Sequence, residues 1–340
     1  MAGTNIAVTG VSGFLGQRLL PLLDANPAVE RIVGIDVRDP ARRARKLTFH
    51  RVDVLNADLA VFLRGVDTIV HLAAVVSPLL DDALMTRVNC GGTRRVLEAA
   101  TATNVRKVIR PSSASIYGAW VNNPVPITED APLRPNPGFL PAILDAESER
   151  LVAQWHDERA GRIATRLRIA PVVGPGAHSL FAAIVTGQVP LHVRNVAPPV
   201  QVVHVEDAAS AIAAAIEHDL DGVYNAAADG WISHEDWQAL LPRRHLPGVP
   251  YEAAERMLHA LWTSGLADVP PTALPYVSHP WVVANDRLKD TGWAPRHTNE
   301  EAILMSVPAP TPSPLPWIAA VVATLVGAAG VTWWLSRRRR

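Results

Sequence analysis

Short apolar runs alternate with amphipathic stretches through the first half of the chain. The apolar runs are bounded by turn residues, which predicts buried strands, and the stretches between them have helical spacing. The predicted strands are Ile6–Thr9, Arg31–Asp36, Lys46–Val52, Thr68–Leu72, Lys107–Pro111 and Ala164–Ile169. The predicted helices are Phe14–Leu23, Arg87–Ala100 and Asp145–Trp155. This order predicts an α/β fold with a doubly wound parallel sheet that is covered by helices on both faces.

The pattern becomes irregular and richer in proline and tryptophan after about residue 175. We therefore predict a core over residues 1–175 and a smaller region over residues 176–307, with some of its strands and helices returning to the core. The smaller region is expected over the carboxyl ends of the strands, on the substrate side. Within it, a helix is expected at Ala208–Ile216, with Asp207 as its cap.

The last part of the chain has a different pattern. Residues 308–316 (PAPTPSPLP) predict an extended proline-rich linker. Residues 317–335 carry no charge and are bracketed by tryptophans, and residues 336–340 end in four arginines. A helix of this length spans roughly 28 Å, about the hydrocarbon thickness of a bilayer. We expect one transmembrane helix here, with a buried terminal helix as the alternative.

The orientation of this span is open. The N-terminal residues Met1–Asn5 are uncharged, and a short apolar run leads from them into a glycine turn. This pattern is not that of a signal peptide. We therefore expect a single-pass membrane protein with its globular part in the cytoplasm. The arginines at 337–340 favour the opposite orientation, because basic residues concentrate on the cytoplasmic side.

Composition excludes several other classes of function. The chain has 340 residues, 49% hydrophobic and 19% charged, with a net charge of zero, so its charge balance does not favour nucleic acid as a partner. Its one cysteine, Cys90, allows no intramolecular disulfide. The twelve histidines are scattered and no Cys/His cluster has zinc-site spacing, so we expect no metal site.

The strongest motif is the G-x-x-G-x-x-G run Gly10–Gly16, which follows a predicted strand and opens a predicted helix. The first glycine suits a tight turn, Gly13 lets the backbone approach a pyrophosphate, and Gly16 lets the helix pack close to the strand. The helix N-terminus then offers N–H groups to the phosphates. The motif predicts a Rossmann-type dinucleotide site that includes Ser12, Phe14 and Leu15 in the same loop.

Asp36 ends the next predicted strand. A carboxylate at this place accepts hydrogen bonds from the adenosine ribose hydroxyls and repels a 2′-phosphate, which favours NAD over NADP. Arg38, Arg42 and Arg43 follow closely, so NADP remains the alternative.

Together with further motifs, this loop resembles the extended short-chain dehydrogenases/reductases, the NAD-dependent epimerase/dehydratase group, over roughly residues 4–305. The further motifs are Asp53-Val54, His71-Leu72-Ala73-Ala74, Asn89–Thr93, Ser112–Gly118, Leu167–Gly176, Val203–Asp207 and Gly292–Arg296. The resemblance implies additional cofactor contacts at Asp53, Val54, Leu72, Ala73, Ala74, Asn89 and Pro171. It also implies a role for Ser113 toward a substrate oxygen, nucleotide sugars or sterol-like alcohols as substrates, and a homodimer formed through residues 81–100 and 145–155.

Several of these residues also have structural interpretations. Asp53 is a candidate turn or helix cap, Asn89 a residue that bonds neighbouring backbone, and Ser113 a turn residue at a strand end. Tyr117 is expected to pack in the interior rather than to donate a proton.

The family's catalytic pair, a tyrosine followed four residues later by a lysine, is missing. That spacing places both side chains on one helix face, where the ammonium lowers the pKa of the phenol. The register set by Ala146–Val152 places Pro141 at the tyrosine position and Asp145 at the lysine position, and no Tyr-x-x-x-Lys occurs anywhere in the sequence.

Three interpretations remain open. The chain is a membrane-attached NAD-binding sensor or scaffold, or an enzyme in which Ser113 binds the substrate oxygen and Tyr117, Asp145 or His156 takes the proton, or a fold that has lost its cofactor. The intact glycines and Asp36 argue against the last. On a helix, Asp145 and His156 lie roughly 16 Å apart, so they are not expected to form a direct pair.

Overall fold

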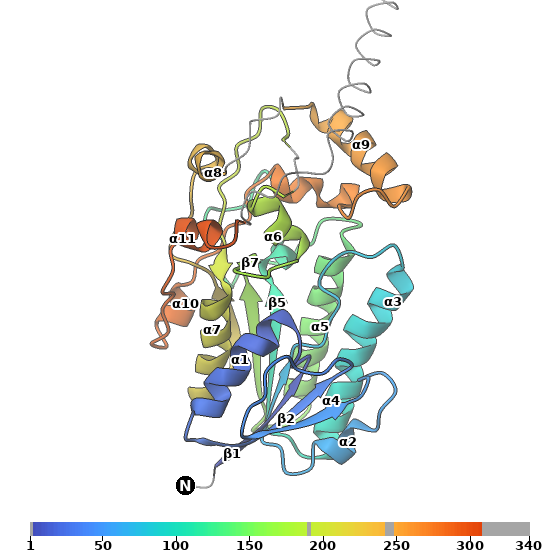
Figure 1. Ribbon diagram of the computed structural model, residues 1–340, viewed down its shortest axis with the longest axis vertical. Coiled ribbons are helices and arrows are strands. Elements are labelled where there is room, and N and C mark those ends of the chain that lie inside the picture. Colours follow the sequence, from blue (N-terminus) through green and yellow to red (C-terminus); the bar gives the residue numbers. More distant parts are fainter. Residues whose placement is uncertain (1–2, 189–191, 242–247, 308–340) are drawn as a thin grey trace, which may run out of the picture. The chain divides into compact units, whose positions relative to one another are not determined.

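A parallel sheet of seven strands organises the chain (Figure 1). The computed structural model describes residues 3–188, 192–241 and 248–307. The strands, in sheet order, are β3 (Leu47–Arg51), β2 (Val29–Asp36), β1 (Thr4–Thr9), β4 (Thr68–His71), β5 (Lys107–Ser113), β6 (Ile163–Ile169) and β9 (Gly222–Ala226). The order reverses between β1 and β4, which confirms the predicted doubly wound α/β fold and marks the crevice where such sheets bind ligands.

Helices cover both faces of this sheet. One face carries α1 (Phe14–Ala25) and α7 (Val205–Glu217), which pack against each other. The other carries α2 (Leu59–Phe62), α4 (Gly92–Ala102) and α5 (Leu140–Asp157). In β1, Ile6 and Val8 join the core on the α1 side, whereas Ala7 joins the core on the α4 side. Because both faces of the central strands are buried, their sequences are continuous apolar runs and do not alternate between apolar and polar residues.

The remaining elements lie mainly beyond the carboxyl ends of the strands (Figure 1). They include β7 (Val172–Val173), β8 (Val203–His204), α6 (Leu180–Val185), α8 (His234–Leu240), α9 (Tyr251–Thr263), η3 (Pro271–Val277), α10 (Asp286–Lys289) and α11 (Asn299–Leu304). A separate apolar core, which includes Phe139, Leu258 and Tyr276, holds several of them together. Because α7 and β9 come from beyond residue 175, that part of the chain also completes the sheet and its covering layer.

Three predicted boundaries change. The helix expected at Asp145 begins at Leu140, because a proline in the first turn costs no hydrogen bond. The helix expected over residues 87–100 follows α3 (Asp82–Thr86) and consists of a π-helical turn, η1 (Arg87–Gly91), followed by α4. The Asp207 cap is wrong, since α7 begins at Val205 with His204 as its cap, and Asp207 instead accepts hydrogen bonds from the backbone and ring of His297.

Within the described ranges, which end at residue 307, no helix is long and apolar enough to cross a bilayer. The predicted linker at 308–316, span at 317–335 and basic tail at 336–340 lie outside the described residues.

Candidate cofactor and active site

The glycine loop joins β1 to α1 at the point where the strand order reverses. Gly10 has a φ of +74°, and a Cβ there would lie 2.7 Å from the backbone of Ala73. A Cβ at Gly16 would lie 2.5 Å from the carbonyl oxygen of Val11. These two glycines are therefore required by the turn and by the close packing of α1 on the loop.

Gly13 differs from the other two glycines. Its φ is negative, and the only atom near its missing Cβ is the carbonyl oxygen of Gly10, at 3.1 Å. Gly13 is also the N-cap of α1, and no side chain caps the helix there. The first turn, beginning with Phe14 and Leu15, thus offers backbone N–H groups beside a position without a side chain, which is the cradle that a pyrophosphate requires.

Asp36 stands at the carboxyl end of β2 beside this cradle. Its carboxylate accepts hydrogen bonds from the backbone N–H groups of Ser12 and Arg38, both at 3.0 Å. The Ser12 hydroxyl in turn donates to the carbonyl of Arg38, at 2.6 Å. The loop and the end of β2 therefore form one connected rim, with a carboxylate whose remaining lone pairs can accept hydrogen bonds from ribose hydroxyls.

Asp53 and Val54 have structural partners. The Asp53 carboxylate accepts hydrogen bonds from the Leu55 backbone and the Asn56 amide, so the residue forms the turn that was one of its two interpretations. Val54 is buried in the core on the α4 side. The contact of both residues with a cofactor stays a prediction.

The end of β4 is fixed against the glycine loop. Leu72 donates from its backbone to the Thr9 carbonyl at 2.9 Å, and the backbone of Leu72 and Ala73 lies beside Gly10. Ala74 follows directly, and its contact with a cofactor stays a prediction. The Asn89 amide both donates to and accepts from the backbone of Val75, at 2.9 and 2.8 Å. Asn89 therefore positions the segment that follows β4, as its backbone-bonding interpretation predicts.

His71, at the end of β4, is a structural residue. Its ring lies between the hydroxyls of Thr9 and Thr93, 2.7 and 3.1 Å away. Burial, with a smaller contribution from Arg110, lowers the pKa of His71 to about 3, so the imidazole is neutral at physiological pH.

Ser113 ends β5 and caps the short helix η2 (Ala114–Tyr117), its hydroxyl accepting from the Ser115 backbone at 3.1 Å. Tyr117 is buried, donates to Asn225 and accepts from Arg168, both at 2.8 Å. Burial raises the pKa of Tyr117 to about 12. Its predicted role in packing is therefore what the geometry supports, and its phenol is not poised for proton transfer.

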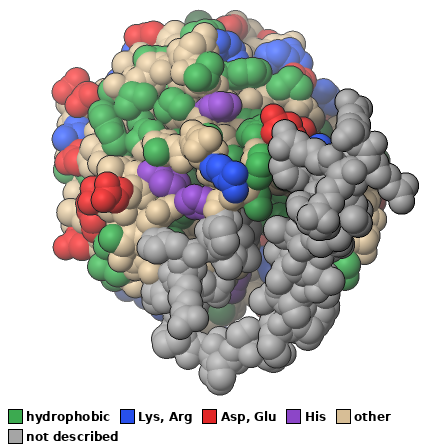
Figure 2. Space-filling view, turned by 90° about the horizontal axis from the view of Figure 1, so that it is seen from above, with side chains coloured by type: hydrophobic (Ala, Val, Ile, Leu, Met, Phe, Trp, Pro, Cys, Tyr) green, Lys and Arg blue, Asp and Glu red, His purple; other side chains and the backbone are tan. Residues whose placement is uncertain are grey.

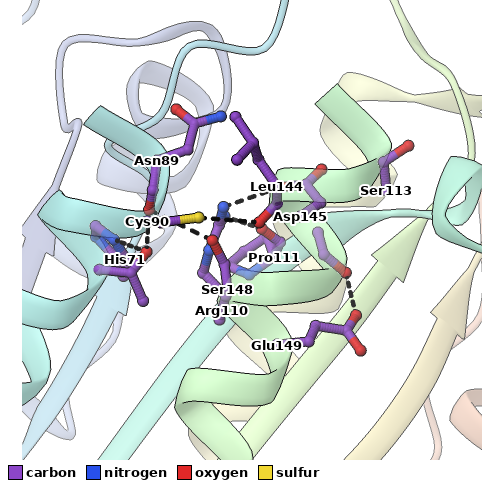
Figure 3. A network of polar contacts seen from close by, with 12 residues as sticks. His71, Asn89, Cys90, Arg110, Pro111, Ser113, Leu144, Asp145, Ser148 and Glu149 are labelled. Atoms are coloured by element: carbon purple, nitrogen blue, oxygen red, sulfur yellow. Dashed lines mark hydrogen bonds and ion pairs between the residues drawn. The ribbon is translucent and has the colours of Figure 1, made fainter. Parts of the chain in front are cut away.

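A buried ion pair includes Asp145, which the sequence register predicts to stand at the position of the family's lysine. Asp145 lies on α5 one turn after Pro141, and its Oδ1 is 3.0 Å from Nη2 of Arg110 on β5 (Figure 3). The Arg110 side chain is only 3% exposed. Burial raises the pKa of Asp145 to about 6, although Arg110 opposes this shift. The site thus holds a carboxylate and a guanidinium at the position where the predicted register would place the family's ammonium.

A second buried ion pair lies behind the first. Glu149, one turn further along α5, contacts Arg168 of β6 at 2.8 Å and also accepts from the Ser112 hydroxyl. By contrast, His156 lies near the end of the same helix as Asp145, and it pairs with Asp157 and Asp221 instead of with Asp145. The sequence did not single out Arg110, Glu149 or Arg168, although charged residues inside apolar strands are the signal that could have found the two arginines.

Pro171 follows β6 and is joined to β8 through its carbonyl, which accepts from the Val203 backbone at 3.0 Å. It lines a cavity on the side of the smaller region. The glycine loop, the ends of β2 and β4, and the β6 end all lie at the carboxyl edge of one sheet, which is where such folds bind dinucleotides.

The fold and the glycine loop define a Rossmann-type dinucleotide-binding protein. The profile of the NAD dependent epimerase/dehydratase family matches residues 6–227, and the chain therefore belongs to that family.

Among its relatives, an uncharacterized protein of Mycobacterium tuberculosis is 30% identical over 66% of the chain, a match that spans 62% of that relative. The 3-diazoavenalumate denitrifying reductase of a Streptomyces species is 28% identical over 86% of the chain and 96% of its own.

Solved structures share the fold. UDP-glucuronic acid 4-epimerase from Bacillus cereus in complex with NAD is 20% identical with a TM-score of 0.67, over 89% of this chain and 97% of that one. UDP-glucose 4-epimerase from Thermus thermophilus in complex with NAD is 23% identical with a TM-score of 0.68, over 89% and 98%.

Proposed function

We propose that this chain binds NAD at the carboxyl edge of its sheet and does so without the tyrosine–lysine hydride chemistry of its family. The residues fit the dinucleotide. The α1 N-terminus beside Gly13 is open to phosphates, and the Asp36 carboxylate stands at the end of the neighbouring strand. The family to which the chain belongs is NAD dependent, and the two similar epimerase structures are complexes with NAD.

The observation that carries the second half of the proposal is the Arg110–Asp145 ion pair. A hydride-transferring member needs a phenol whose pKa is lowered by a neighbouring ammonium. Here Pro141 has no proton to give, and Asp145 would raise the pKa of a nearby phenol. When NAD is bound, its nicotinamide can supply hydride chemistry, but these side chains do not supply the accompanying proton transfer. We infer a sensor or scaffold whose state depends on NAD.

A second function is favoured by one observation. Of the three proton acceptors considered from the sequence, Tyr117 and His156 are engaged elsewhere. Asp145 is paired with Arg110, but burial raises its pKa to about 6. A carboxyl group that titrates near neutrality can act as an acid or base. In that case Asp145 would exchange a proton with a substrate oxygen held by Ser113.

Hydride transfer by the full-length chain distinguishes the two functions. Nicotinamide absorbance is followed with NAD and with NADH, against nucleotide sugars and sterol-like alcohols. The sensor function predicts no turnover with any of them. Turnover that is lost in Asp145→Asn but kept in Asp157→Asn, an exposed carboxylate on the same helix, would establish the second function instead.

We also propose that residues 317–335 attach the chain to a bilayer in a single pass, with the globular part in the cytoplasm. The support is the sequence alone: a charge-free segment between a proline-rich linker and an arginine block. Membrane fractionation with an alkaline wash tests it, since a spanning chain stays in the pellet. Protease protection of the globular part then decides the orientation. The homodimer implied by the family resemblance stays a prediction that sedimentation can test.

A further inference from the structure

A cavity opens beside Pro171, on the side of the smaller region. About 50 Å³ of it admits the centre of a water-sized sphere, and the hollow with its open mouth measures about 560 Å³. Its walls come from the segment after β6, from α6 and α8, from residues 198–201 and from η3 with the segment that follows it. Because Pro171 is also a predicted cofactor contact, a molecule in this cavity would lie next to the dinucleotide crevice.

Aromatic side chains form one wall of this cavity. The ring centroids of Phe181, Tyr276 and Trp281 lie 4.8 to 5.4 Å from one another, in tilted or edge-on arrangements. Trp237 on α8 also lines the cavity. Rings at these separations present both faces and edges, and such surfaces bind another planar ring well.

The polar groups on these rings are already engaged within the protein. The Tyr276 hydroxyl donates to the Ser115 carbonyl, and the indole N–H groups of Trp237 and Trp281 donate to the carbonyls of Val185 and Tyr276. The Gln201 amide likewise bonds to the backbone of Gly230 and Val283. A ligand therefore meets the apolar surfaces of these residues rather than free donors.

Charge is the feature that decides the class of ligand. Of the residues that the structure places around the cavity, none is Lys, Arg, Asp or Glu, and His234 is the sole imidazole. Burial and the neighbouring His192 lower the pKa of His234, which favours its neutral form. A diphosphate buried here would leave its negative charges without a countercharge from these walls, which is costly. Figure 2, which looks onto the molecule from above, shows hydrophobic and histidine side chains together with a basic side chain in the middle of the described surface.

We propose that this cavity receives an uncharged, mainly apolar molecule with a planar ring, and not a nucleotide diphosphate. The inference rests on the proposed function, because it names the class of ligand that would bind next to NAD. It separates this chain from the similar structures that are epimerases of UDP-linked sugars.

Binding of 2-naphthol and of UDP-glucose to the full-length chain tests this proposal. Calorimetric titrations are made with and without NAD. We expect 2-naphthol to bind and UDP-glucose neither to bind nor to displace it. Phe181→Ala removes one ring of the aromatic wall and should weaken the affinity for 2-naphthol about tenfold. Phe62→Ala is the matched control, because Phe62 is also partly buried but lies on α2, against His50.

Tighter binding of UDP-glucose than of 2-naphthol, no binding of 2-naphthol, or equal losses in the two phenylalanine variants would each overturn the proposal. Thermal unfolding checks that Phe181→Ala is folded. If it is not, Ile184→Ala, on the same wall, replaces it with the same expected direction. NAD titration of the unsubstituted chain keeps the two claims separate: absence of NAD binding there contradicts the proposed function, whereas absence of 2-naphthol binding there contradicts the cavity assignment. In Phe181→Ala, weaker 2-naphthol binding with unchanged NAD binding is the expected result.

Discussion

Arg110 and Asp145 form a buried ion pair, with Nη2 of the strand residue 3.0 Å from Oδ1 of the helix residue. The pair joins the middle of the sheet to α5 (Figure 3), at the position that the sequence register predicts for the family's lysine. It has consequences for both stability and proton chemistry.

Removing the guanidinium should destabilise the fold. Arg110→Met leaves a buried carboxyl without its countercharge, and we expect the free energy of unfolding to fall by about 2 to 3 kcal/mol at neutral pH. Arg106→Met is the control, because its pair with Asp219 is about half exposed and should matter by less than about 1 kcal/mol. Equal losses in urea denaturation would show that burial of the pair has no special role.

The same pair predicts a pH dependence. The folded-state pKa of Asp145, about 6, lies above its ordinary value of 3.8. The protonated carboxyl is thus favoured by folding, so its contribution is full below pH 3.8 and is lost as the pH rises through 6. Asp145→Asn should remove a decline on the order of 2 kcal/mol over this interval. Parallel stability curves for the two proteins between about pH 4 and 7 would contradict the assignment.

Asp36 should determine the choice of dinucleotide. Asp36→Ala removes the acceptor for the ribose hydroxyls and the charge that repels a 2′-phosphate, so we expect NAD affinity to fall about tenfold while NADP affinity changes little or rises. Titration with both nucleotides measures this. An equal fall in affinity for NAD and NADP would mean that Asp36 only holds the backbone of Ser12 and Arg38 in place.

The glycine at position 16 should be required for the stability of the fold. A Cβ at Gly16 would meet the backbone oxygens of Val11 and Gly10 at 2.5 and 2.6 Å, so Gly16→Ala should cost about 2 kcal/mol of unfolding free energy. Gly91→Ala, a helical glycine whose Cβ would make only an ordinary contact with Leu55, should be neutral or slightly stabilising. If Gly16→Ala were as stable as Gly91→Ala, the tight packing of α1 on the loop would be wrong.

Local pattern was enough to predict the sheet and the cofactor loop, because strands buried on both faces read as apolar runs and the glycine spacing reflects backbone geometry. The start of α5 and the cap of α7 were misplaced because Pro141 suits a first turn and because Asp207 is held by His297, which is distant in sequence. The ion pairs of Arg110 and Arg168 could not be predicted, since they depend on how α5 lies across β5 and β6 rather than on any spacing within one segment.

Calorimetric titration of the full-length chain with NAD, NADH, NADP and NADPH tests the central claim most directly. We predict binding of NAD in the micromolar range, tighter than NADP, and abolished by Gly13→Val in a protein that still unfolds at the temperature of the unsubstituted chain. Absence of binding to all four nucleotides would contradict the account and leave the glycine loop without its proposed ligand.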